Sequence, residues 1–250
     1  MPLEEFLEAL ADPAAYTPVG EFVELSDLAP VELGVFARTW FGIDVEHQRW
    51  IISTMLELAE QNPEFDFSSV FKMCLKDPDE AVLEKSMEGL WESEDRSIIP
   101  GLIQVLNSGK SAHVRSLAAV ALGKFSGLVQ DGKLLLKDGE AIHDCLMAIL
   151  ANEEVHMEVR RRSLEAIAPF NTEEIQRLVT LAYQDEDLLL KSSSIFAMGR
   201  TGEVSWLPVL IKELENPEPS IRYETANACA ELAEEESVPH LIALLEDEDD

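Results

Sequence analysis

The chain has 250 residues, of which 46% are hydrophobic, so it holds enough apolar material for a large core. Its 19 Lys and Arg residues stand against 49 Asp and Glu residues, which gives a formal net charge of −30. Nucleic acids and anionic membranes bind proteins through cationic side chains, so this charge argues against both and favours a basic protein partner. Solubility or adaptation to salt explains the same acidity equally well.

The cysteines and the N-terminus indicate the compartment. Cys74, Cys145 and Cys229 are far apart, and no CxxC motif occurs. An odd number of scattered cysteines fits a reducing compartment, and their apolar helical surroundings favour burial. The segment MPLEEFLEALADP carries acids where a signal peptide needs bases, and no apolar run reaches the roughly 18 residues of a membrane span. We therefore expect a cytoplasmic protein that does not enter a membrane.

Residues 1–65 are predicted to form an N-terminal helical cap. Residues 25–43 favour one helix, with Ser26 or Asp27 as its N-cap and Pro30 in its first turn. Residues 44–62 favour a second helix, capped by Asp44. This pair is interpreted as a degenerate first repeat that closes the end of a stack. Its aromatic residues favour a heavy core, with partner binding as the alternative; they are Phe36, Trp40, Phe41 and Trp50.

From residue 66 onward the chain repeats itself. A branched apolar residue followed by a base or by leucine recurs along the chain, and its last two steps are 31 residues each. These marks are Val82-Leu83, Val114-Arg115, Val159-Arg160, Leu190-Lys191 and Ile221-Arg222. We predict repeats over 66–95, 96–125, 141–170, 172–202 and 203–233, an insertion over 126–140 and a half repeat over 235–250.

Each repeat is predicted to hold two helices. The first carries apolar residues at i, i+3, i+4 and i+7, as Leu207, Leu210, Ile211 and Leu214 do. A turn rich in Asp, Asn and Pro follows, and the second helix carries small residues. Two of these second helices have a glycine near their predicted end, where the backbone is expected to turn. A two-helix unit cannot bury its own apolar face, so the copies must stack.

Two irregularities leave alternatives open. The step from Val114 to Val159 is 45 residues, and the extra residues fall at 126–140, with Lys133 and Lys137 as uncommon bases. This insertion is interpreted either as a functional loop or as an extended helix or ordinary loop. The chain also stops after the first helix of a further repeat. The half repeat over 235–250 is either a cap or the place where the sequence was cut.

The pattern PxLIxxLxxxxxxxVRxxAAxALG resembles HEAT repeats, specifically the phycobilisome-lyase type of HEAT-like repeat, over Asp66 to Asp250. The resemblance implies an all-α fold, an α-solenoid built as a superhelix of stacked antiparallel helix pairs like those of HEAT and armadillo proteins. The chain departs from the family pattern at Leu83 and Lys191, where Arg is preferred, and at Ala168 and Ala230, where Gly is preferred. These departures weaken individual interfaces and leave the fold assignment intact.

No catalytic, metal-binding or cofactor-binding residue is predicted. The sequence contains no HExxH, GxSxG, GxxxxGK[ST] or GxGxxG motif. Deoxyhypusine hydroxylase, an enzyme built from similar repeats, binds iron through His-Glu dipeptides. None of the five histidines here precedes a glutamate.

The resemblance implies that the second helices line a concave groove. Positions one, two and five after each aligned base are then expected to face that groove. Together these positions hold three bases and four acids, so the groove is expected to be nearly neutral in a very acidic chain. Partner-binding residues are expected to be Leu117, Val120, Arg161, Arg162, Glu165, Phe196, Tyr223, Glu224 and Asn227. The alternative is that the solenoid curls tightly and these side chains pack on each other.

The aligned bases themselves have a different expected role. Arg115, Arg160, Lys191 and Arg222 are predicted to bridge adjacent turns as a structural ladder. Taken together, these features predict a non-catalytic scaffold that binds a protein partner, one with basic groups or an extended segment. The resemblance implies an alternative, a bilin lyase or lyase-chaperone acting on a tetrapyrrole protein, and an oxidoreductase like the hydroxylase is a weaker one.

Overall fold

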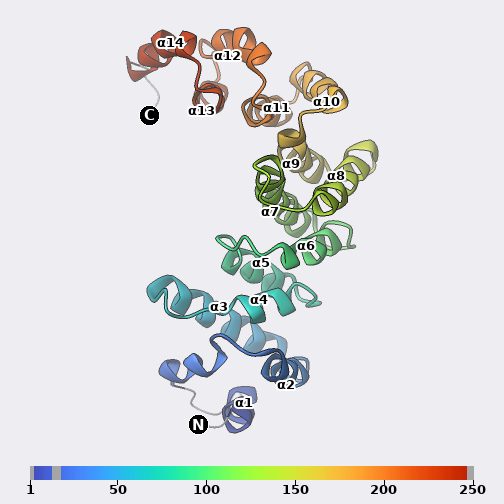
Figure 1. The fold of residues 1–250 in the computed structure, drawn as a ribbon, viewed down its shortest axis with the longest axis vertical. Coiled ribbons are helices and arrows are strands. Elements are labelled where there is room, and N and C mark those ends of the chain that lie inside the picture. The colour runs from blue at the N-terminus through green and yellow to red at the C-terminus, as the bar shows by residue number, and fades with distance from the viewer. Residues whose placement is uncertain (1–2, 13–17, 247–250) are drawn as a thin grey trace. The chain divides into compact units, whose positions relative to one another are not determined.

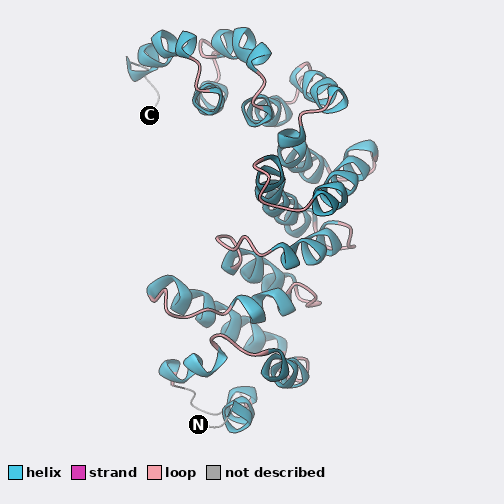
Figure 2. Cartoon of the chain, in the orientation of Figure 1, coloured by secondary structure: helices cyan, strands magenta, loops and turns pink. Residues whose placement is uncertain are grey.

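The computed structural model describes residues 3–12 and 18–246, and its described residues form helices and loops without a strand (Figures 1 and 2). The chain divides into two compact units, Met1–Leu117 and Ala118–Asp250. In each unit short turns connect successive helices, and second helices of neighbouring pairs pack together, such as α11 on α13. The predicted fold class, an α-solenoid, is confirmed.

The first unit contains the predicted cap and the first repeats. Its helices are α1 (Leu3–Ala11), η1 (Val19–Leu25), α2 (Pro30–Trp40), α3 (Val45–Gln61), α4 (Ser68–Cys74), α5 (Glu80–Gly89), η2 (Arg96–Ile98) and α6 (Ile99–Leu106). Helix α7 (Ala112–Gln130) begins in this unit and continues into the second. Helices α3 and α5 pack on each other, as do α2 and α4.

The second unit contains the regular repeats. Its helices are α8 (Leu136–Ala151), α9 (Met157–Ile167), η3 (Ala168–Phe170), α10 (Glu173–Tyr183), α11 (Leu188–Thr201), η4 (Val204–Trp206), α12 (Leu207–Glu213), α13 (Pro219–Leu232), η5 (Glu235–Ser237), α14 (Val238–Ala243) and η6 (Leu244–Glu246). Helix α11 packs on both α9 and α13, so the second helices form one continuous layer. The last residues of the predicted half repeat, 247–250, lie outside the described residues.

Side-chain caps start several helices and explain where the turns end. Asp44 accepts a hydrogen bond from the Glu46 backbone at 3.0 Å, which confirms it as the cap of α3. Asp187 does the same for α11, and the His156 imidazole accepts one from Glu158 N at the start of α9. The predicted cap at Ser26 or Asp27 is wrong. Helix α2 begins at Pro30, which lacks an N–H and has a backbone torsion suited to a first helical position.

The residues over 126–140 do not form a long loop. Helix α7 continues through them to Gln130, and α8 already begins at Leu136, so only a short turn remains between the helices. Asp131 and Gly132 lie in this turn, where Gly132 has a φ of +71°. Of the two interpretations of the insertion, the structure bears out the extended helix.

The two units fill their cores differently. In the first unit six of the largest fully buried side chains are aromatic: Phe6, Phe22, Phe36, Trp40, Phe67 and Phe71. Two aromatic residues expected in this core are instead exposed, Phe41 at 59% and Trp50 at 42%. In the second unit small residues such as Ala197, Ser194 and Ala228 are fully or almost fully buried, so helix backbones approach closely.

Glycines mark the closest of these approaches. A Cβ on Gly199 would lie 2.7 Å from the Ala228 Cα, and one on Gly123 would lie 3.1 Å from the Ala166 Cα. Neither glycine has a positive φ, and the left-handed residue that ends α11 is Gly202. The expectation that they permit a turn is therefore wrong, because what they permit is close packing of neighbouring second helices.

Contacts between neighbouring repeats recur at the predicted period. Arg49 pairs with Asp79 at 2.7 Å, and the Ser111 hydroxyl donates to Glu80 at 2.5 Å. The Tyr183 hydroxyl donates to Glu213 at 2.5 Å. These partners are 30, 31 and 30 residues apart. The repeat is therefore a repeat of side-chain contacts as well as of helices.

Candidate protein-binding face

The second helices α9, α11 and α13 form one layer in the second unit, and the surface over them is called here the second-helix face. Within this unit Figure 1 shows α8, α10 and α12 in one row and α9, α11 and α13 in the other. The predicted partner-binding positions from Arg161 to Asn227 lie on these three helices. Val120 lies on α7 in the same unit, whereas Leu117 belongs to the first unit; both are half-buried.

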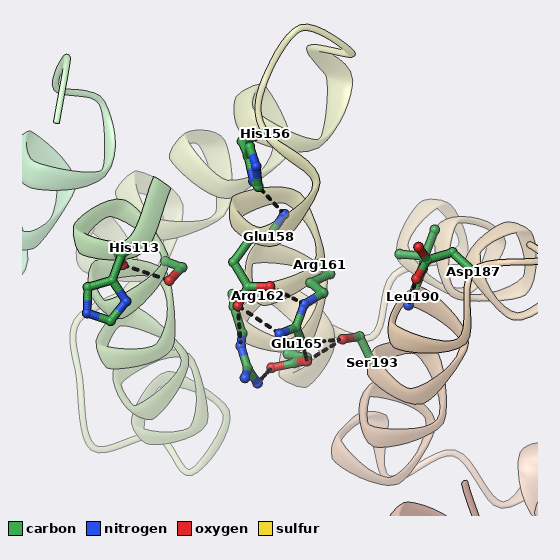
Figure 3. A network of polar contacts seen from close by, with 10 residues as sticks. His113, His156, Glu158, Arg161, Arg162, Glu165, Asp187, Leu190 and Ser193 are labelled. Atoms are coloured by element: carbon green, nitrogen blue, oxygen red, sulfur yellow. Dashed lines mark hydrogen bonds and ion pairs between the residues drawn. The ribbon is translucent and has the colours of Figure 1, made fainter. Parts of the chain in front are cut away.

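Over α9 this face is occupied by a closed network of charges (Figure 3). Arg161 donates two hydrogen bonds to Glu158, from Nε at 2.5 Å and from Nη2 at 2.7 Å. Arg162 donates to Glu165 at 2.8 Å, and the Ser193 hydroxyl of α11 donates to the other oxygen of Glu165 at 2.5 Å. Two guanidinium groups and two carboxylates thus satisfy one another.

Burial and pKa shifts show that this network is structural in character. The Arg161 side chain is 12% exposed and that of Glu165 10%. Burial disfavours the charged form of Glu158, yet Arg161 and Arg162 outweigh it and hold the pKa of Glu158 below its usual range. The expectation that Arg161 and Glu165 would face an open groove is wrong, because Arg161 is bonded to Glu158 of its own helix and Glu165 accepts a hydrogen bond from Ser193 of α11. Arg162 and Glu158 are partly open, at 36% and 31%.

Between α11 and α13 the face is open. A pocket of 510 Å³ is lined by residues of both helices, among them Phe196, Arg200, Glu224, Asn227 and Glu231. Phe196 is 36% exposed and Tyr223, on α13, is 70% exposed. The structure therefore brings three predicted residues, Phe196, Glu224 and Asn227, to a single pocket.

Glu224 carries the least satisfied charge of this pocket. Burial raises the pKa of Glu224, the nearby Glu165 carboxylate raises it further, and Arg162 opposes both. Its ionised form is therefore disfavoured in the unbound protein, and a cation placed in the pocket would stabilise it.

Two charged residues of the pocket that the prediction missed lie on the same faces of α11 and α13 as predicted ones. Arg200 and Glu231 are 31 residues apart and approach to 3.4 Å. Each is four residues beyond a predicted position, Phe196 or Asn227, and so lies one helical turn further along the same face. Extending the i, i+4 series by one step would have identified both.

Of the aligned bases predicted to bridge adjacent repeats, Lys191 has such a contact, whereas the carbonyl bonds of Arg115 and Arg222 lie within their own repeats. Arg115 donates from Nε to the Leu106 carbonyl at 2.8 Å, and Arg222 donates to the Asn216 carbonyl at 2.9 Å. These two bonds tie the helices of one repeat together. Lys191 instead pairs with Glu213 of the following repeat at 3.0 Å and lies over the Tyr183 ring. The fourth base, Arg160, lacks this kind of contact at its Nε.

Other classes of site are not evident in the described residues. Within residues 3–12 and 18–246 no group of three or more His, Cys, Asp and Glu side chains could hold a metal ion. No helix among those residues is long and apolar enough to cross a bilayer. Cys74, Cys145 and Cys229 are buried, as predicted.

Comparison with known proteins supports the repeat architecture. A sequence model described as HEAT repeats matches residues 175–250. No curated protein sequence matches the chain. Among solved structures, the Escherichia coli protein YibA is similar with a TM-score of 0.50 and 16% identity, over 80% of this chain and 69% of YibA.

A designed armadillo repeat protein is similar to the same degree. Its TM-score is 0.50 at 12% identity, over 92% of this chain and 99% of the design. At such low identity both similarities concern the fold alone. The sequence match assigns HEAT repeats to residues 175–250, and the shared folds support an α-solenoid.

Proposed function

We propose that the second unit is a non-catalytic binding module that holds a segment of a partner protein on its second-helix face, in the pocket between α11 and α13. One observation supports this most directly. Phe196, Glu224 and Asn227 come from two helices and two repeats, yet they line the same 510 Å³ pocket. Solenoids commonly use the surface of such stacked helices to bind other proteins.

The side chains of the pocket indicate the chemistry of the partner. Phe196 offers an aromatic ring for an apolar side chain, and the exposed Tyr223 extends this apolar surface. Glu224 would gain a counter-ion from a Lys or Arg of the partner. The exposed amide of Asn227 can donate to and accept from a backbone peptide group. An extended basic segment that also carries an apolar residue combines all three contacts.

The charge of the whole chain favours the same class of partner. A formal charge of −30 attracts cations over distances up to about 10 Å at moderate salt and accelerates their association. Long-range attraction alone does not select a partner. The pocket adds selectivity because a basic group reaching Glu224 must also place an apolar group on Phe196.

The test uses peptides selected from a random library on the full chain. Enriched peptides are expected to combine Lys or Arg with an apolar residue. Phe196→Ala and Glu224→Gln are each expected to weaken their binding about 10-fold, as loss of an anchor contact does. Val204→Ala and Glu215→Gln are matched controls, because these exposed residues do not line the pocket. Equal binding by wild type, Phe196→Ala and Glu224→Gln, all folded by circular dichroism, would contradict the proposal.

Acidification provides an independent readout. The pKa of Glu224 is raised, so its carboxylate becomes protonated at a higher pH than an ordinary glutamate. A selected basic peptide is therefore expected to lose affinity as the pH falls through this raised pKa. The Glu224→Gln variant should lack that step while retaining any pH dependence that arises elsewhere in the chain.

A further inference from the structure

A second cleft lies away from the α11–α13 pocket, at the junction of the repeats over 141–170 and 172–202. It has a volume of 190 Å³ and is lined mainly by apolar side chains of α8, α9, α10 and α11. Leu150, Leu164, Leu178 and Leu190 contribute to its walls. Leu181 and Met157 also line it and are 58% and 39% exposed, so the cleft opens onto apolar surface.

One charged group in this cleft is unsatisfied. Arg160 lines the cleft, and its Nε is buried without a hydrogen-bond acceptor among the residues that the structure describes. A buried donor without an acceptor is costly, and more so when the group carries a charge. Packing among the described residues therefore does not explain why this donor is buried without an acceptor.

Equivalent residues in other repeats show what Arg160 lacks. Arg115 follows the end of its first helix by nine residues, and its Nε donates to the carbonyl of Leu106, the last residue of α6. Arg160 follows Ala151, the last residue of α8, by the same nine residues. Arg222 follows Glu213, the last residue of α12, by nine and also bonds a carbonyl just beyond that helix. The spacing is the same in these repeats, yet the buried Nε of Arg160 has no acceptor among the described residues, and Arg160 lines an apolar cleft.

The size of the cleft restricts what can occupy it. Pockets for cofactors and drug-sized ligands measure roughly 300–1,000 Å³. A cavity of about 150 Å³ holds one benzene ring. At 190 Å³ the cleft therefore suits one branched or aromatic side chain together with a small charged group. The charged group must be an anion, because it would pair with Arg160.

We propose that this cleft binds the C-terminal residue of a partner peptide, with the terminal carboxylate on Arg160 and an apolar side chain among the leucines. A terminal carboxylate and its own side chain share one Cα, so both fit within the small volume. An internal acid and a neighbouring apolar residue would need more space. The surrounding acidity opposes a carboxylate, and Asp185 itself lines the cleft, so recognition depends on the contact with Arg160.

The probe is N-acetyl-L-leucine, and its neutral isostere N-acetyl-L-leucinamide serves as the matched ligand. Binding to the full chain is followed by NMR shifts of the leucine and methionine methyl groups. We expect the acid to bind at least about 10-fold more tightly than the amide, the usual effect of a charge-assisted hydrogen bond. Equal affinity for acid and amide, or absence of shifts at Leu164 and Leu178, would overturn the proposal.

Two variants separate recognition from folding. Arg160→Leu is expected to abolish the preference for the acid and to leave the midpoint of unfolding unchanged or raised. Arg222→Leu, which loses a carbonyl contact, is expected to lower the midpoint and to keep the preference. A midpoint lowered equally by both variants would show that Arg160 has the same structural bond as Arg222 and would overturn the proposal.

Decanoate distinguishes a peptide end from a lipid. Its tail exceeds the cleft, so it is expected to bind no more tightly than N-acetyl-L-leucine. Binding of decanoate at least 10-fold tighter would assign the cleft to fatty acids and overturn the peptide proposal. Because none of these residues lines the α11–α13 pocket, this outcome is independent of the function proposed above.

Discussion

The two units of this solenoid use the same helix pairs but stabilise them in different ways. In the first unit, large aromatic side chains fill the space between helices, and Trp40 and Phe36 are fully buried. In the second unit, glycine, alanine and serine bring the helix backbones together, most closely at Gly199 and Ala228. The repeat architecture thus fixes the positions of the helices strictly, but it allows different side chains to fill the space between them.

Ion pairs between side chains of different helical segments also differ between the two units. In the first unit Lys72 of α4 pairs with Asp95 at 2.7 Å, and both side chains are exposed by more than a third. In the second unit Lys191 pairs with Glu213 at 3.0 Å, and Glu213 is only 6% exposed. Water screens the first pair and is nearly excluded from the second, so the second should contribute far more to stability.

The largest effect is expected from truncating the aromatic core. Trp40→Ala should lower the free energy of unfolding by about 3–5 kcal/mol, because it leaves a large cavity. The Trp40 indole also donates to Asp77 at 2.7 Å, and Asp77 is only 3% exposed. Guanidinium denaturation followed by far-UV circular dichroism measures this loss.

Trp40→Phe separates the two contributions in that experiment. This variant keeps most of the ring volume and removes the hydrogen bond, so the free energy of unfolding is expected to fall by about 1–3 kcal/mol. A loss below 1 kcal/mol for Trp40→Ala would show that the first unit does not depend on its aromatic core.

Glu213→Ala should be the next most damaging change. Glu213 accepts hydrogen bonds from Tyr183 and from Asn216, each at 2.5 Å, and pairs with Lys191. Removing Glu213 leaves the partly buried ammonium of Lys191 without its partner. We therefore expect the free energy of unfolding to fall by about 3 kcal/mol, the lower end of the range for a broken buried ion pair. The exposed Glu215→Ala is the control. Equal midpoints of unfolding for the two variants would contradict the assigned importance of the buried bridge.

The same bridge makes a pH-dependent prediction. Burial, followed by the bond to Glu213, raises the pKa of Tyr183 to about 12. A folded pKa above the unfolded value of about 10 means that this contribution is complete below pH 10 and is lost as the pH rises through 12. Ultraviolet titration of the phenolate in Glu213→Gln should show Tyr183 titrating closer to 10. An unchanged titration would mean that Glu213 does not influence the phenol.

A smaller change in stability is expected where the backbones of neighbouring second helices are in contact. Gly199→Ala places a Cβ against the backbone of α13 and should destabilise the protein by about 1–3 kcal/mol through overpacking. Gly34→Ala is the matched change in the first unit, where a Cβ would meet nothing within 4 Å. It should stabilise α2 by about 0.5–1 kcal/mol. Thermal unfolding of both variants tests the opposite signs, and the same sign for both would contradict the close-packing interpretation.

Much of this fold could be predicted because the repeat period follows from patterns of residues that are close together in the sequence. The 31-residue spacing of marks such as Leu190 and Ile221 and the cap at Asp44 depend on local chemistry, and both appear in the structure. The role of Gly123 could not be predicted in this way. A glycine that permits a turn and one that permits contact with Ala166 look alike until the neighbouring helix is placed.

The candidate site shows the same division. Helical spacing correctly placed Glu224 and Asn227 on one face of α13, because side chains three residues apart share a face, and the repeat period placed Phe196 on the corresponding face of α11. It also assigned Arg161 and Glu165 to an open groove, although the two are bonded to Glu158 and Ser193. Spacing identifies the face of a helix, whereas the partner that satisfies each charge depends on distances between helices.

The smallest effect is expected at the exposed pair of the first unit. Hydrogen bonds from Lys72 and Ser97 lower the pKa of Asp95 to about 2. A folded pKa below the unfolded value of about 3.9 gives stability that is present above pH 4 and lost as the pH falls through 2.

Because solvent screens the pair of Lys72 and Asp95, Lys72→Met should lower the free energy of unfolding by less than about 1 kcal/mol at neutral pH. It should raise the pKa of Asp95, as measured by NMR, while the bonds from Ser97 keep that pKa below the ordinary value. At pH 2 the wild type and the variant should unfold with nearly equal free energies. A loss at neutral pH as large as that of Glu213→Ala would show that burial does not set the value of these bridges, and the contrast between the two units would then lie in their cores alone.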